Sequence, residues 1–241
     1  MSYSNTLPFK AALESSEFIR KNAILKESYP ALCASDLKNN LADISLVPVG
    51  ALNMLDNYNI ITDFCIAANR KVESVLLLSQ KPKSEIKYVL LDYQSKTSVK
   101  LIKIIANKFW KYNFEFIEAK PGFENNISKD CAAVIIGDRA LELRNAFPYV
   151  YDLAEVWYNY TGLSSVFAVW VAKNGICPEF ISEFNNVLSL GNSKKKEIAG
   201  QFASNYMGFD LENYLVNCID YYFDEEKKIS MNKFLQLAQE I

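Results

Sequence analysis

The sequence predicts an α/β protein built as two lobes. Short apolar runs of strand length alternate with segments in which apolar residues recur at helical spacing. From about Pro178 onward, only helical patterns follow. The chain has 241 residues, half of them hydrophobic, which is enough for one large domain or two small ones with filled cores. Such an alternation also favours largely parallel strands.

The individual elements follow from these patterns in chain order. Strands are predicted at residues 43–49, 72–79, 88–91, 132–136 and 166–172. Helices are predicted at residues 9–18, 29–39, 98–112 and 153–160, and then at 178–190, 193–207, 211–222 and 230–241. We find no internal repeat and no low-complexity linker.

Two of the apolar runs are long enough to pass between lobes. They are residues 72–79 and 164–172, and they bracket a middle segment of about 85 residues. If both are crossovers, residues 77–168 form a second lobe inserted into a first lobe of residues 1–76 and 169–241. A cleft between two lobes is a common place for a ligand. A single domain is the alternative.

Charge and hydropathy argue against nucleic acid and membrane as partners. The formal net charge is −2, and the only basic cluster, residues 194–196, is expected on a solvated helix face. No apolar stretch approaches the roughly 20 residues of a membrane span. The N-terminus has no signal-peptide pattern, so we expect a cytoplasmic protein.

The cysteine and histidine content narrows the possible chemistry. Five scattered cysteines form no Cys-x-x-Cys pair, so neither a disulfide framework nor a zinc site is expected. The chain has no histidine, which excludes Ser-His-Asp and Cys-His catalysis. We expect no metal and no cofactor.

A hydroxyl-rich segment joins a predicted strand to a predicted helix. Ser95, Thr97 and Ser98 lie between the apolar run 88–91 and the helical pattern that follows. Free N–H groups and the positive end of the helix dipole suit an anion at such a helix start. Serine and threonine are also common N-caps, and on local sequence alone capping is the favoured interpretation.

Read together, seven segments resemble one family, the chorismate dehydratases of the futalosine route to menaquinone. The segments are residues 2–9 (SYSNTLPF), 43–49 (DISLVPV), 72–79 (VESVLLLS), 91–98 (LDYQSKTS), 135–141 (IIGDRAL), 151–157 (YDLAEVW) and 161–170 (TGLSSVFAVW). They occur in family order over nearly the whole chain, so the joint match is specific although each piece alone is weak.

The resemblance implies a two-lobed type 2 periplasmic-binding-protein-like fold with two crossover strands and a C-terminal helical segment. It also implies an enzyme that removes water from chorismate, a small dicarboxylate, to give 3-[(1-carboxyvinyl)oxy]benzoate. No residue of the matched segments is an evident base, so we expect the enolpyruvyl carboxylate of the substrate to take the proton. Oligomerisation is possible.

The resemblance also assigns roles to residues. Asn5 and Ser74 match the family's functional Asn and Ser, while Ser95, Thr97 and Ser98 match its carboxylate-binding helix start. Asp138 is a further substrate-binding candidate. The structural alternatives are an Asx-turn or cap at Asn5, a polar interruption of a strand at Ser74 and a helix cap at Asp138. Arg139 is expected to be a solvated side chain.

Two features depart from the family pattern. Relatives carry a short strand ahead of the segment matched by residues 2–9, whereas this sequence starts at Met1. Either the true start lies upstream or the strand has been lost, and a missing central strand would expose sheet edges and loosen the support behind Asn5. Relatives usually have Pro-Phe after Thr-Gly-Leu, whereas Ser164 and Ser165 stand here. This change bears on cleft shape or substrate choice.

Three alternative functions stay open at this stage. The sister enzyme 1,4-dihydroxy-6-naphthoate synthase shares the fold, but its family looks as if it uses a catalytic histidine. This chain has no histidine. A solute-binding protein for a transporter would carry a signal peptide or a lipidated cysteine. A non-catalytic relative would bind an aromatic carboxylate without turnover.

Overall fold

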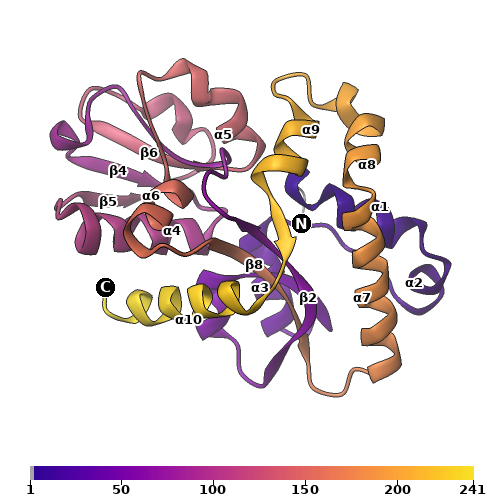
Figure 1. Cartoon of the computed structure of the whole chain (residues 1–241). Coiled ribbons are helices and arrows are strands. Elements are labelled where there is room, and N and C mark those ends of the chain that lie inside the picture. The colour runs from indigo at the N-terminus through magenta and orange to yellow at the C-terminus, as the bar shows by residue number, and fades with distance from the viewer. Residues whose placement is uncertain (1–2) are drawn as a thin grey trace.

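The computed structural model describes residues 3–241 and contains two β-sheets with helices packed around each (Figure 1). Met1 and Ser2, the latter being the first residue of the 2–9 motif, lie outside the described residues. The predicted α/β class and the two-lobed arrangement are confirmed. The chain passes from the first sheet to the second through residues 69–74 and returns through residues 162–164.

The first sheet has the strand order β1-β8-β2-β9. Its strands are β1 (Ile44–Pro48), β8 (Ser165–Lys173), β2 (Tyr58–Ala68) and β9 (Asp220–Tyr222). The second sheet has the order β5-β4-β6-β3-β7. Its strands are β5 (Glu115–Glu118), β4 (Tyr88–Leu91), β6 (Cys131–Ile136), β3 (Val75–Ser79) and β7 (Tyr149–Asp152).

Ten α-helices lie in the described part of the chain, and most of them cover the two sheets. They are α1 (Leu7–Ser15), α2 (Glu17–Asn22), α3 (Pro30–Lys38), α4 (Lys96–Ile104), α5 (Asp138–Leu143), α6 (Leu153–Thr161), α7 (Pro178–Ser193), α8 (Lys195–Phe202), α9 (Leu211–Asn213) and α10 (Glu225–Gln239). Helix α1 packs against α7, and α10 reaches from β8 to α4 (Figure 1). A 3₁₀ turn (Ser4–Thr6) precedes α1, and a π-helical turn (Tyr214–Cys218) follows α9.

The expectation of largely parallel strands is wrong. Strand β8 is antiparallel to both β1 and β2, and β3 is antiparallel to both β6 and β7. Parallel pairing is confined to β4 with β5 and with β6. The cause is the insertion of one lobe into the other, because the strand that leaves a lobe and the strand that returns to it run in opposite directions.

The two crossovers are also shorter than predicted. The apolar run 72–79 contributes β3 to the second sheet, and the run 164–172 contributes β8 to the first, so neither strand spans both lobes. Glu73 adopts a left-handed conformation, with φ of 60°, and redirects the chain immediately before β3. Asp152 accepts hydrogen bonds from the backbone N–H groups of Val72 and Glu73, at 3.0 and 2.7 Å, and fixes this turn.

The C-terminal third is not purely helical, because β9 replaces the end of the predicted helix at 211–222. The π-helical turn ends this helix at Cys218, and β9 then pairs with β2. Strand β2 itself is absent from the sequence prediction. Polar residues interrupt its apolar pattern, and the Thr62 hydroxyl bonds the backbone of Phe64 within an irregular stretch of the strand.

Aromatic side chains fill the core beneath the first sheet. Phe9 is 1% exposed and contacts the rings of Phe64, Trp170 and Tyr221 at centroid distances of 5.1 to 6.1 Å. These rings come from α1, β2, β8 and β9. The contacts of the Phe9 ring with the first sheet therefore anchor helix α1, which fixes the position of the Ser4–Thr6 turn that precedes it.

Candidate functional site

Asn5 lies in the Ser4–Thr6 turn, which is held from both lobes. From the second lobe, the Asp138 carboxylate accepts hydrogen bonds from the backbone N–H of Ser4 at 3.2 Å and from its hydroxyl. From the first lobe, the Tyr221 hydroxyl donates to the Asn5 carbonyl at 2.9 Å. The Asn5 side chain forms no cap or Asx-turn, and its Oδ1 is buried without a hydrogen-bond partner in the described structure.

Ser74 lies immediately after the left-handed Glu73, and its side chain is 1% exposed. Its carbonyl accepts a hydrogen bond from the Gly137 N–H at 2.8 Å. Burial raises the pKa of Asp152, the residue that holds this turn, to about 6. The hydrogen bonds of Asp152 to the preceding turn and of the Gly137 N–H to the Ser74 carbonyl fix the position of Ser74, in addition to the packing of the strand.

Asn5 and Ser74 come together at Tyr214, which the sequence analysis did not identify. The Tyr214 hydroxyl donates to Ser74 Oγ at 2.7 Å. Burial strongly raises the pKa of Tyr214, and hydrogen bonding with Ser74 and with Asn5 offsets only part of that rise. The sequence signal for Tyr214 is weak, because it is one aromatic residue in an apolar helical pattern. A buried tyrosine hydroxyl nevertheless requires a partner.

The three hydroxyls near the start of α4 are engaged within the protein. Ser95 is the N-cap of α4, and its Oγ accepts from the Ser98 N–H at 3.0 Å. Thr97 Oγ1 accepts from the Gly50 N–H at 3.0 Å and donates to the Phe167 carbonyl at 2.9 Å. All three hydroxyl residues are buried. The capping interpretation describes Ser95, while carboxylate binding by this segment stays a prediction.

A second group of contacts joins the lobes at Tyr3. Its hydroxyl donates to Gln94 Oε1, and its ring lies against Gly137. Beside it, Arg139 donates to Asp92 at 2.7 Å and also pairs with Glu124. The expectation of a solvated Arg139 is wrong, because these two carboxylates hold the guanidinium.

Ser164 and Ser165, which replace the family's Pro-Phe, lie at the return crossover. The Glu226 carboxylate of α10 accepts hydrogen bonds from the Ser164 N–H at 2.7 Å and from its hydroxyl at 2.8 Å. Ser164 thus ties the crossover to the C-terminal helix. The predicted effect on cleft shape or substrate choice stays a prediction.

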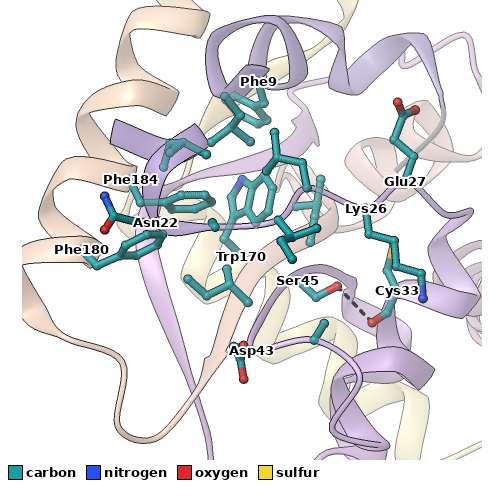
Figure 2. A pocket seen from close by; sticks show the side chains of 18 of the residues that line it. Phe9, Asn22, Lys26, Glu27, Cys33, Asp43, Ser45, Trp170, Phe180 and Phe184 are labelled. Atoms are coloured by element: carbon teal, nitrogen blue, oxygen red, sulfur yellow. Dashed lines mark hydrogen bonds between the residues drawn. The ribbon is translucent and has the colours of Figure 1, made fainter. Parts of the chain in front are cut away.

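A cavity of about 940 Å³ is lined by Thr6 and Phe9 but not by Asn5, Ser74 or Tyr214. It opens beside β1, which forms one edge of its sheet. The expected effect of a missing first strand stays a prediction. Figure 2 shows Trp170, Phe180 and Phe184 grouped on one side of this cavity, while the Ser45 hydroxyl donates to the Cys33 carbonyl at 3.0 Å on another.

The described residues give no further pointer to a metal or a membrane. No group of His, Cys, Asp or Glu in residues 3–241 could hold a metal ion. Within the same residues, no helix has both the length and the apolar character needed to cross a bilayer.

Comparison with known proteins decides the family. The family model described as menaquinone biosynthesis matches residues 1–240. The chain belongs to the menaquinone biosynthesis family. Within the curated proteins, a chorismate dehydratase of Thermus thermophilus is 25% identical over 206 residues, which cover 75% of this chain and 73% of that protein.

Solved structures place this member of the menaquinone biosynthesis family in the type 2 periplasmic-binding-protein-like fold. A protein of Archaeoglobus fulgidus matches with a TM-score of 0.76 at 12% identity, covering 99% of this chain and 94% of its own. The alkanesulfonate-binding protein of Xanthomonas axonopodis pv. citri matches with a TM-score of 0.67 at 11% identity, covering 97% and 89%. The predicted fold is confirmed.

Proposed function

We propose that this protein is a chorismate dehydratase that converts chorismate to 3-[(1-carboxyvinyl)oxy]benzoate and water, as a carbon–oxygen lyase. The family match and the similarity to the Thermus thermophilus enzyme support the proposal. The observation that carries it is the meeting of Asn5 and Ser74, which lie 69 positions apart in the sequence, at Tyr214.

The reaction breaks the ring C–H bond beside the ether oxygen and the C–O bond of the neighbouring hydroxyl, and it leaves an aromatic ring. The cluster holds neutral groups, so the proton goes to the enolpyruvyl carboxylate of chorismate itself. Asn5 and Ser74 orient the reacting face of the ring. Such positioning can lower a barrier by several kcal/mol.

The second lobe supplies an anchor for a substrate carboxylate. Ser95, Thr97 and Ser98 bracket the start of α4, where the first backbone N–H groups have no partner within the helix. Because Ser95 Oγ already accepts from the Ser98 N–H, the N–H groups of Lys96 and Thr97 are the donors that a carboxylate would meet. Asp138 contributes indirectly, by holding Ser4 and hence Asn5 in place.

The proposal is tested by incubating the purified protein with chorismate and following the aromatic product. We expect turnover by the wild-type protein and at least a hundredfold lower kcat in Asn5→Ala and in Ser74→Ala, roughly the cost of removing one positioned hydrogen-bonding group. Asn125→Ala is the matched control, because Asn125 is exposed in the second lobe and bonds only its own loop. Near wild-type turnover in both site variants would refute the assignment.

The same assay separates the enzyme from a binding protein. The fold is shared with substrate-binding proteins, so binding of chorismate without product is the competing outcome. Calorimetry with chorismate and with the aromatic product distinguishes the two. Tight binding of chorismate that stays unchanged over hours would establish a non-catalytic binding protein.

A further inference from the structure

We propose that Tyr214 is a positioning residue that turns the Ser74 hydroxyl proton toward the substrate. The inference rests on the proposed dehydratase function and adds a residue that the matched sequence segments do not contain. Tyr214 lies in the π-helical turn after α9, far along the chain from both Asn5 and Ser74.

The Tyr214 side chain is held rigidly. It is 1% exposed, and its ring packs edge-on against Phe209, with centroids 5.9 Å apart. Its residue is also the first of a π-helical turn, an irregularity that is frequent at functional sites. The hydroxyl therefore has one orientation, with its oxygen 2.7 Å from Ser74 Oγ.

The direction of this hydrogen bond determines what Ser74 can do. The Tyr214 hydroxyl carries a single proton and donates it to Ser74 Oγ at 2.7 Å. Ser74 Oγ donates to no acceptor among the hydrogen bonds of residues 3–241. The Ser74 proton is thus free for an acceptor that the protein does not provide.

Asn5 offers the complementary group. Its Oδ1 is buried and lacks a hydrogen-bond donor in the described structure, while its side chain interacts with the Tyr214 hydroxyl. One unfilled donor on Ser74 and one unfilled acceptor on Asn5 match a ligand hydroxyl, which both accepts and donates. The leaving hydroxyl of chorismate has this character.

Tyr214 transfers no proton in this scheme. The ring C–H proton still goes to the enolpyruvyl carboxylate, and the C–O bond breaks with its electron pair on the departing oxygen. That oxygen then takes the same proton from the carboxylic acid and leaves as water, which restores the carboxylate. Ser74 stabilises the departing oxygen through a hydrogen bond that strengthens as charge develops there, and Tyr214 directs that bond. Its effect should therefore be larger on kcat than on KM.

The test is a double-mutant cycle on chorismate turnover with Tyr214→Phe, Ser74→Ala and the double variant. Tyr214→Phe should lower kcat about tenfold to hundredfold and change KM less than about threefold. In the Ser74→Ala background, the same substitution should change kcat less than about twofold, because Tyr214 acts through Ser74. Circular dichroism confirms that each variant is folded.

Tyr151→Phe is the matched control. Tyr151 is a partly buried tyrosine of β7 whose hydroxyl accepts from the Lys83 N–H at 2.9 Å, away from the cluster. It should keep the wild-type kcat. Equal losses from Tyr214→Phe in both backgrounds, or a wild-type kcat in Tyr214→Phe, would overturn the inference alone. An inactive wild-type protein would overturn the proposed function, and the inference with it.

Discussion

Gly137 is the position at which adding a single methyl group should weaken the contact between the two lobes and lower the free energy of unfolding. Its φ of 65° and ψ of −148° lie in a region that is essentially restricted to glycine. A Cβ atom there would lie 2.4 Å from both Cδ1 and Cε1 of the Tyr3 ring. Gly137→Ala therefore combines backbone strain with a clash across the contact between the lobes.

The size of the effect follows from these two terms. The backbone conformation costs an alanine about 1–3 kcal/mol. Displacing the Tyr3 ring breaks its hydrogen bond to Gln94, which contributes about 1 kcal/mol more. Alanine also lowers the conformational entropy of the unfolded chain, which stabilises the folded protein by about 0.4–1 kcal/mol and offsets part of this cost. The net loss is about 1–4 kcal/mol, a large share of a typical stability of about 5–15 kcal/mol.

The measurement is the free energy of unfolding from urea denaturation, with Gly162→Ala as the matched control. Gly162 also has a positive φ, of 72°, but a Cβ there would meet no atom within 4 Å. The entropy term is common to both variants and cancels in the comparison. Gly137→Ala should be the less stable by about 1 kcal/mol or more.

A Tyr3→Ala background isolates the clash. There, Gly137→Ala should cost only the backbone term, because the ring it would strike is gone. If Gly137→Ala is no more destabilising than Gly162→Ala, or if Tyr3→Ala fails to reduce its cost, the assigned contact between Tyr3 and Gly137 is wrong.

Two further substitutions test the polar network. Burial raises the pKa of Asp152 from an ordinary value of 3.8 to about 6, so the folded protein binds this proton more tightly than the unfolded chain does. The stabilisation from the protonated carboxyl is therefore complete below about pH 4 and is lost as the pH rises through about 6. In urea titrations from pH 4 to 8, wild type should lose up to about 3 kcal/mol relative to Asp152→Asn, and parallel curves would contradict this. Thr97→Val leaves the Gly50 N–H and the Phe167 carbonyl without their partner and should cost about 2–4 kcal/mol in the same assay; a cost below about 1 kcal/mol would contradict that role.

The sequence predicts the class of fold well because the apolar runs of the second lobe are almost uninterrupted. Strands β3, β4 and β6 are buried nearly throughout and lie close to their predicted positions. Strand β2 is absent from the prediction because the polar residues Asn59, Thr62 and Asp63 interrupt the apolar pattern of its first half, where Asn59 and Asp63 are exposed. Strand direction differs from the prediction because the periodicity of apolar residues reports burial and carries no information about the path of the chain between lobes.

The candidate site could be predicted only where its residues belong to a contiguous motif. Asn5 and Ser74 stand in segments that resemble a family, so the sequence points to them. Tyr214 lies in an apolar stretch of the sequence. Its role in the candidate site follows from the hydrogen bond of its hydroxyl to Ser74, which is 140 positions away in the sequence. A role of this kind depends on tertiary contact, which no local pattern encodes.

The contacts of residues 3–5 divide between the lobes in a way that bears on how the site is assembled. Tyr3 and Ser4 bond Gln94 and Asp138 of the second lobe. Asn5 is instead bonded through its carbonyl to Tyr221 of the first. Separation of the lobes would therefore break the contacts of the first two residues and leave those of the third.

Ser74 shows the same division within one residue. Its hydroxyl accepts from Tyr214 of the first lobe, and its carbonyl accepts from Gly137 of the second. The Asn5–Tyr214–Ser74 cluster thus belongs mainly to the first lobe, whereas the helix start at α4 belongs to the second. Because Ser74 is bonded to both lobes, closure of the lobes would bring the helix start at α4 toward the Asn5–Tyr214–Ser74 cluster while Ser74 keeps the two parts connected.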